Sequence, residues 1–456
     1  MTGIVRELYY GGSGTVVFLL VVSAEVILLL LAAGRVPLQY SLRNLAVRWK
    51  TTLLTALAFT LVVAVMAVML AFVEGMKRLT RGTGEPGNVI VLAEGNTDET
   101  FSNLPVGDLT DIEQQPGVLR DAPGRPLASR ECYMVINQPF PDAPPGKPKR
   151  RFLQVRGIDD IEQAAAVHNL RLAAGQWFSP AGVEEREFPD GTRRMVVQGV
   201  LGRGIAEELG RARSPKHRAS AAHPDRLEVG DLFELADRTW VVTGIMDSEA
   251  TTFNSEIWAK RSVVGPLVGK EGYTTLVVRT AGPAAAARFK DFLEREYDKA
   301  KVKAYVETEY YENLTQTTTQ FLIAIVVVTF FIAIGGVFGV MNTMFAAVSQ
   351  RRRDIGVLRL LGYDRRQILL AFLLESLVIA LGGGLLGCAL GMLADGWSAT
   401  SVISGHAGGG KFVVFRLVVD AQILGAGLLL ALAMGLVGGL VPAWSAMRLK
   451  PLEVLR

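Results

Sequence analysis

Hydrophobic positions along this chain gather in five long windows that hold almost no charge, whereas charged residues crowd the segments between them. A helix over 53–73 would be about 31 Å long, which matches the thickness of a bilayer's hydrocarbon core. Two of the five windows contain a single acid, Glu25 in one and Glu375 in the other. We therefore predict membrane-spanning helices over 16–34, 53–73, 321–348, 368–394 and 421–447.

Basic residues predict how these spans are oriented, because Lys and Arg accumulate in short cytoplasmic loops. The segments 35–52 and 349–367 are rich in arginine, whereas 395–420 is balanced in charge. This pattern places 74–320 outside the cytoplasm and the carboxyl terminus inside. A cleaved signal peptide at the amino terminus is the alternative to the first span. It would put 35–52 outside, against the charge rule, so a true span is favoured.

The segment 74–320 is too long for a loop and has the composition of an ordinary domain. Short runs rich in β-branched residues alternate with polar pieces, which predicts an α+β domain. The segments next to the membrane, 74–81 and about 307–320, are predicted to extend the spans outward as a stalk. Predicted strands lie at 88–94, 151–158, 193–200, 231–235, 239–246 and 274–280, predicted helices at about 200–210 and 283–300, and exposed loops at 139–151 and 210–226.

Composition excludes several classes of protein. The net charge is only +4, and the basic residues lie beside the spans rather than on one patch, so we predict no nucleic-acid partner. The two cysteines, Cys132 and Cys388, fall in regions that cannot meet, which argues against a disulfide. The four histidines lack the spacing of a zinc site, and no catalytic triad or paired carboxylates stand out by motif. We expect no cofactor and no metal.

A glycine-rich motif, GHAGGGK over 405–411, superficially fits a phosphate-binding loop. Phe412 follows it, where such a loop needs Ser or Thr for magnesium, and no strand is predicted before it. We interpret the motif as a flexible turn in an outside loop. The chain is then not itself an enzyme, and any ATP hydrolysis must come from a separate protein.

Three passages and the carboxyl terminus resemble one known family. They are the basic stretch and first charge-free span over 37–75, the strands and turns of 230–259 preceded by 195–210, the passage VMNTMFAAVSQRRRDIGVLRLLGYDRRQILLAFLLESLVIALGGGLLGCALG over 340–391, and the ending PAWSAMRLKPLEVLR over 442–456. The sequence is similar to the MacB/FtsX family of ABC transporter permeases, which includes lipoprotein-release and DevC-like exporter relatives. The third passage is the most specific of these matches.

The resemblance implies a helical transmembrane bundle with an α+β, MacB-like periplasmic core domain, in a multi-pass protein of the inner membrane. It divides the chain into an additional amino-terminal span (1–36), an amphipathic segment with the first core span (37–75), an extracytoplasmic domain (76–318) and an FtsX-like permease domain with three spans (319–456). The family's usual plan has four spans, so 16–34 departs from it.

The resemblance also implies a function. Such a permease couples ATP hydrolysis by a separate ABC ATPase subunit to movement of its outer domain, for export or extraction of a substrate. Its partners are that ATPase, a second permease subunit and the lipid bilayer; a membrane-fusion protein and an outer-membrane channel stay open. The alternative is a non-transporting, FtsX-like regulator of a cell-envelope enzyme. A large outer domain favours export, and the substrate stays open.

The resemblance places a coupling helix at about 349–361, where it would dock into a groove of the ATPase. Apolar side chains there offer a face for such a groove, arginines can pair with an acidic rim, and a glycine can end the helix. The alternative is that the arginines only fix the topology and contact lipid headgroups. The predicted partner-binding residues are Arg351, Arg352, Arg353, Asp354, Ile355, Val357, Leu358, Arg359, Leu361 and Gly362. Leu360 belongs to the same apolar face.

Ionisable groups within spans are costly and often functional. For Glu375 we favour a packing or hinge role over a proton relay, and Glu25 has the same alternatives. Glycines recur at four-residue spacing in three spans, which indicates close helix contacts. Packing within one subunit is the favoured interpretation of any single stripe, and a dimer interface is the alternative. The stripes are Gly335 and Gly339, Gly383, Gly387 and Gly391, and Gly435 and Gly439.

Overall fold

The computed structural model describes residue 43 and residues 47–449, apart from 140–149, 189, 214–220, 271, 315 and 405–409. The predicted first span over 16–34, with Glu25, lies outside the described residues. The chain forms two compact units. The first, here called the bundle, comprises the described residues up to Glu74, Phe321–Trp397 and the described residues from Leu417 onward. The second, here called the outer domain, comprises Gly75–Gln320 and Ser398–Arg416.

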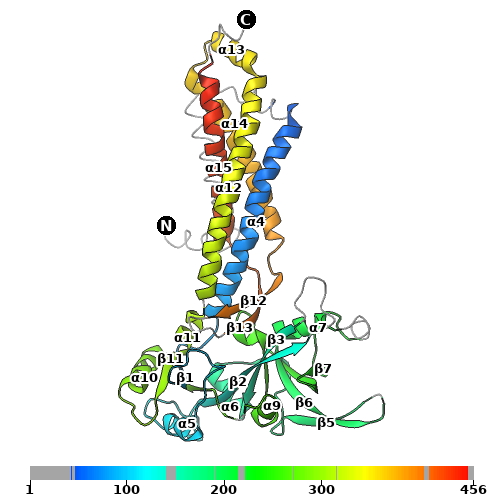
Figure 1. Cartoon of the computed structure of the whole chain (residues 1–456), viewed down its shortest axis with the longest axis vertical. Helices are drawn as coiled ribbons and strands as arrows, with labels where there is room; N and C mark the ends of the chain where they lie inside the picture. The colour runs from blue at the N-terminus through cyan, green and yellow to red at the C-terminus, as the bar shows by residue number, and fades with distance from the viewer. Residues whose placement is uncertain are drawn as a thin grey trace. The chain divides into compact units, whose positions relative to one another are not determined.

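The bundle is built from long helices that run side by side (Figure 1). Among the described residues, four helices are long and apolar enough to cross a membrane, which confirms the four predicted spans that fall there. The first continues to Arg81, as predicted for the stalk. The second begins only at Gln316, after a separate short helix. The four are α4 (Trp49–Arg81), α12 (Gln316–Gln350), α14 (Arg365–Met392) and α15 (Ala421–Met447).

Glycines let the backbones of three bundle helices approach closely. A Cβ on Gly383 of α14 would lie 2.5 Å from the carbonyl oxygen of Ala56 on α4. A Cβ on Gly435 of α15 would lie 2.6 Å from the Cβ of Ala380 on α14. Both distances are too short for a side chain, so these stripes serve packing within one subunit, as favoured from the sequence. Gly335 and Gly339 of α12 differ, because a Cβ there would meet nothing within 4 Å in the part of the chain that the structure describes.

The described residues of the outer domain form a mixed sheet of eleven strands in the order β11-β1-β10-β2-β3-β9-β6-β8-β4, with β5 paired to β6 and β7 to β8. The pairs β3–β9 and β6–β8 are parallel and the others antiparallel. Its strands are β1 (Asn88–Ala93), β2 (Ala128–Pro139), β3 (Arg150–Ile158), β4 (Leu172–Gly175), β5 (Val183–Glu187), β6 (Arg193–Gly202), β7 (Leu232–Leu235), β8 (Arg238–Met246), β9 (Glu256–Lys260), β10 (Thr275–Arg279) and β11 (Val302–Val306).

Short helices cover the sheet and enclose two apolar cores. One core is centred on β2, β3, β6, β8 and β9 and includes Trp240, and the other lies between β1, β10, β11 and helices that include Phe289. Figure 1 shows some of these helices at the two ends of the sheet and others below its middle. They are α5 (Val106–Glu113), α6 (Ile161–His168), α7 (Arg203–Arg211), the 3₁₀ turn η1 (Thr252–Ser255), α9 (Arg261–Leu267), α10 (Pro283–Arg295) and α11 (Glu307–Asn313).

The segment between α14 and α15 also belongs to the outer domain. Its described residues form an antiparallel hairpin of β12 (Ser398–Ser404) and β13 (Gly410–Arg416). The amide nitrogen of Val414 donates to Oγ of Ser255 over 2.7 Å, and Nδ2 of Asn254 donates to the Val414 carbonyl over 3.1 Å. The sequence predicted a flexible turn at 405–411. That prediction is wrong for Lys411, which lies in β13 and is buried.

Candidate coupling site

A short helix, α13 (Arg352–Leu360), joins the second and third described spans. It ends where the sequence predicted, because Gly362 adopts a left-handed backbone with φ of +95°. The amide of Tyr363 donates to the Leu358 carbonyl over 3.1 Å and that of Gly362 to the Arg359 carbonyl over 3.3 Å. This is the hydrogen-bond pattern of a Schellman motif, in which a glycine ends a helix abruptly. The helix therefore has a defined end rather than a frayed one.

The third span starts directly after this turn. The Asp364 side chain accepts from the backbone amide of Gln367. In return, the Asp364 amide donates to Oε1 of Gln367 over 2.8 Å. Such a capping box satisfies two backbone donors that the first turn of a helix would otherwise leave unpaired. Because only a few residues separate two well-defined helix ends, α13 is held on a short connection to α14.

The outward face of α13 carries apolar side chains between charged ones. Val357 is 46% exposed and Leu360 61%, and Leu361, directly after the helix, is 72% exposed. Leu358 and Arg359 are half-buried. The charged residues at the start of the helix, Arg352, Arg353 and Asp354, are exposed.

Two residues predicted to contact a partner point the other way. Arg351 is 6% exposed and Ile355 2% exposed, and Ile355 belongs to the apolar core of the bundle. Neither side chain is available on the outer face of α13. Their assignment to a partner-binding surface is therefore corrected: these two residues attach α13 to its own subunit.

Arg351 forms a two-pronged ion pair with Glu375 of α14. Nη1 lies 2.8 Å from Oε2 and Nη2 lies 3.0 Å from Oε1, and both side chains are almost fully buried. The guanidinium also lies 5.9 Å from the ring centre of Phe372. Paired donors and acceptors in this fork geometry are among the strongest side-chain contacts in proteins. The intramembrane acid that stood out in the sequence is thus one half of a bridge between the start of α13 and the middle of α14.

The glycine-rich motif at 405–411, which superficially fits a phosphate-binding loop, ends in a lysine that is not available to a nucleotide. Its lysine, Lys411, is buried in the outer domain and forms an ion pair with Glu99. A phosphate-binding lysine must reach the nucleotide, and this amino group is already surrounded by protein.

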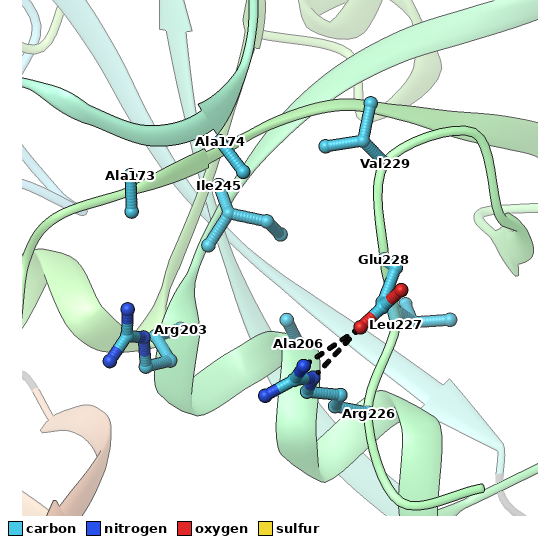
Figure 2. A pocket seen from close by; sticks show the side chains of 9 residues that line it. All are labelled: Ala173, Ala174, Arg203, Ala206, Arg226, Leu227, Glu228, Val229 and Ile245. Carbon is cyan, nitrogen blue, oxygen red and sulfur yellow. Dashed lines mark hydrogen bonds and ion pairs between the residues drawn. The ribbon is translucent and has the colours of Figure 1, made fainter. Parts of the chain in front are cut away.

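The outer domain also contains a recess that the sequence did not indicate (Figure 2). Its volume is about 310 Å³, and its walls come from β4, α7, β8 and the segment before β7. Most of the lining is apolar. Arg226 pairs with Glu228, with Nη2 2.8 Å from Oε1, and Arg203 lies at the other side, as Figure 2 shows. The lining residues are Ala173, Ala174, Arg203, Ala206, Arg226, Leu227, Glu228, Val229 and Ile245.

Comparison with known proteins identifies the family. A model described as the MacB-like periplasmic core domain matches residues 52–296, more than half of the chain, and one described as FtsX-like permease C-terminal matches 326–451. The chain belongs to the MacB/FtsX-type family of ABC transporter permeases. The two matches correspond to an α+β extracytoplasmic domain and a helical membrane region, as the sequence predicted.

Individual relatives agree with this assignment. The permease is 23% identical over 416 residues to "Uncharacterized ABC transporter permease YknZ" of Bacillus subtilis, covering 89% of this chain and 94% of YknZ. It is 25% identical over 398 residues to "Macrolide export ATP-binding/permease protein MacB" of Shewanella oneidensis, covering 81% of this chain but only 55% of MacB. The permease thus spans about half the length of its MacB relatives. A solved structure of the extracellular domain of YknZ covers 48% of this chain and 99% of that domain, with 12% identity and a TM-score of 0.30.

Proposed function

We propose that this permease transmits mechanical work. A separate ABC ATPase subunit binds the outward face of α13, and nucleotide-driven closure of the ATPase moves that helix. The movement passes through the bundle to the outer domain, which then exports or extracts a substrate. The observation that carries the proposal is the face of α13 itself, where three exposed aliphatic side chains stand beside exposed arginines on a helix fixed to its own subunit by a buried ion pair.

Physical chemistry supports a protein partner for this face. Apolar side chains on one side of a helix fit a groove in a partner, and arginines at its edge guide the encounter and pair with acids. The exposed residues Val357, Leu360 and Leu361 supply the apolar part, and Arg352 and Arg353 supply the charge. The proposed surface therefore omits Arg351 and Ile355, which the bundle buries.

The same proposal includes the orientation of the chain. With α13 in the cytoplasm, the outer domain lies on the opposite side of the membrane and the carboxyl terminus lies inside. The basic loops support this arrangement, because the α12–α14 connection is rich in arginine. A reporter fused after residue 456 should then be active in the cytoplasm, and one inserted near residue 146 should be active only outside; the reverse result contradicts the orientation.

A second copy of the permease is the proposed partner in the membrane. The α12 helix is the least buried of the four described spans, and a Cβ added at Gly335 or Gly339 would meet no described residue within 4 Å. In the other two stripes, glycines pack against neighbouring helices of the same bundle. An unused stripe of small residues on an exposed apolar helix suits close contact with a second helix of the same kind.

The decisive experiment compares Leu361→Asp with the wild-type permease, purified with the ATPase that accompanies it. Because a carboxylate would have to be desolvated in an apolar groove, we expect the amount of ATPase that co-purifies to fall at least tenfold. Leu361→Ala should have a smaller effect. Val229→Asp is the matched control, since Val229 is 44% exposed in the outer domain and the change in charge is the same. Normal association and ATP turnover in Leu361→Asp would refute the docking role of α13.

A further inference from the structure

Seven charged side chains form one cluster inside the outer domain, and this cluster has no place in the proposed coupling site. The residues come from almost every part of the domain, and all of them are buried. They are Glu99, Glu131, Arg156, His168, Glu256, Glu307 and Lys411. Buried charges are costly unless each is paired, so a cluster of this size must be held together by its own contacts.

Arg156 of β3 is the centre of the cluster. Its Nε and Nη2 bind the two carboxylate oxygens of Glu256 on β9 over 2.7 and 2.8 Å. Its Nη1 lies 2.8 Å from Oε1 of Glu99 and also pairs with Glu131 of β2. The guanidinium lies over the rings of Tyr133 and Phe253. Arg156 therefore joins neighbouring strands to the segment that follows β1.

One arm of the cluster leads to the two long helices that enter the domain. His168 at the end of α6 lies 2.7 Å from Glu131 and 2.9 Å from Glu307, the first residue of α11. Oε2 of Glu307 accepts from the amide of Glu85 and from Nδ2 of Asn88, both over 2.9 Å. These last two residues follow the end of α4, and α11 precedes α12. The arm thus connects the chain that leaves α4 with the chain that enters α12.

The other arm leads to the β12–β13 hairpin. Nζ of Lys411 pairs with Oε2 of Glu99, and it lies 4.4 Å from the ring centre of Tyr133 and 5.1 Å from that of Tyr311. The hairpin is continuous with the third and fourth described spans, since α14 precedes it and α15 follows it. Lys411 is therefore the point at which the connection between those spans enters the charged cluster.

A count of charges indicates that the cluster needs this lysine. Four carboxylates face Arg156, Lys411 and one histidine. Burial disfavours the charged form of His168, but the carboxylates of Glu131 and Glu307 outweigh burial and raise its pKa to about 10, so it supplies a third positive charge. Without Lys411, Glu99 would have to share Arg156 with Glu131 and Glu256 in a site that excludes water. The outer domain is thus electrostatically incomplete without the hairpin.

We infer that this cluster is the junction through which movement of α14 and α15 enters the outer domain, and that Lys411 is the positioning residue that couples the hairpin to it. This inference rests on the proposed mechanical function. In this arrangement all the chain passages between bundle and outer domain meet in one continuous chain of hydrogen bonds and ion pairs, from Glu85 and Asn88 through Glu307 to Lys411. The outer domain then responds to its supporting helices as a single body.

The test uses the full-length permease with its ATPase in lipid nanodiscs, and it measures amide hydrogen exchange with and without a non-hydrolysable ATP analogue. The variant Lys411→Met/Glu99→Gln removes both charges of the pair, so that no unpaired charge is left to unfold the domain. We expect exchange over 410–416 to become at least tenfold faster and to lose its response to the analogue, while ATP turnover stays within twofold of wild type. Lys411→Arg keeps the positive charge and should retain part of the response of hydrogen exchange to the analogue.

A matched control is Lys303→Met/Glu294→Gln, which removes a lysine–glutamate pair of the same domain whose lysine side chain is 44% exposed. It should behave as wild type. A nucleotide response that survives unchanged in Lys411→Met/Glu99→Gln would overturn the role of Lys411 and leave the proposed function intact. A wild-type complex whose outer domain does not respond to the analogue would instead overturn the proposed function, together with the inference that rests on it.

Discussion

The ion pair between Arg351 and Glu375 allows a direct separation of structural from partner-binding arginines. Substituting Arg351 by Met keeps much of the aliphatic stem but leaves the Glu375 carboxylate buried and unpaired. Breaking a buried pair by removing one partner costs about 3–5 kcal/mol. At roughly 2–4 °C per kcal/mol, the lower limit corresponds to a fall in melting temperature of about 6–12 °C. Glu375→Gln should cost less, because a neutral amide can still accept from Arg351.

A double-mutant cycle then isolates the pair. In Arg351→Met/Glu375→Leu no buried charge is left, so most of the stability should return and the coupling energy should reach at least about 2 kcal/mol. The cycle is completed by the melting temperatures of wild type, Arg351→Met, Glu375→Leu and the double variant, all measured in the same detergent. Arg352→Met is the control, because Arg352 is exposed. It should leave the melting temperature unchanged and weaken ATPase association. Equal melting temperatures for Arg351→Met and Arg352→Met would refute the distinction between these adjacent arginines.

Two further predictions concern the outer domain and the membrane interface. The pKa of His168 is raised from 6.5 to about 10, so its contribution to stability is complete below pH 6.5 and is lost as the pH rises through 10. The free energy of unfolding of the outer domain should therefore fall by on the order of 5 kcal/mol between pH 6.5 and pH 10. If this free energy depended on pH equally steeply in His168→Gln, the reasoning would be contradicted. In the bundle, Gly335→Leu/Gly339→Leu should reduce dimerisation in bicelles at least tenfold without lowering the melting temperature. Gly383→Leu should instead unfold the bundle by clashing with α4. Unaltered dimerisation in Gly335→Leu/Gly339→Leu would refute the proposal that this face of α12 contacts a second permease.

The membrane helices could be predicted closely from the sequence. The charge-free window 421–447 coincides with α15 at both ends, because a bilayer selects for uninterrupted apolar helices and Asp420 and Arg448 bound this one. A short helix is also present where the family resemblance predicted one, and it ends at the predicted glycine; its coupling role stays a proposal. The inward orientation of Arg351 and Ile355 was not predicted. In the run Arg351, Arg352, Arg353 the residues look alike, and only the position of Glu375, on another helix, distinguishes the first from the others.

The outer domain was predicted less completely, and its charged cluster is one reason why strands and buried residues there were missed. Strand β2 lies near the middle of the sheet, yet it contains Arg130 and Glu131, which interrupt an apolar pattern. Glu131 is tolerated there because Arg156 and His168 outweigh the cost of burial and lower its pKa to about 2. Neither partner is its neighbour in the sequence. For the same reason, Lys411 was interpreted as part of a flexible turn, since its only visible context was a run of glycines.

The β12–β13 hairpin has a practical consequence for work on the living cell. Short loops between spans are the usual places to insert epitope tags, protease sites or fluorescent labels, and by length alone the α14–α15 connection would be a natural choice. In this permease, its two strands are packed against η1 and hold a buried lysine in the outer domain. An insertion within β12 or β13 would therefore disrupt a protein interior. Loss of signal from the tag, or degradation of the tagged protein, would then result from damage to the fold. It would not show which side of the membrane the loop occupies.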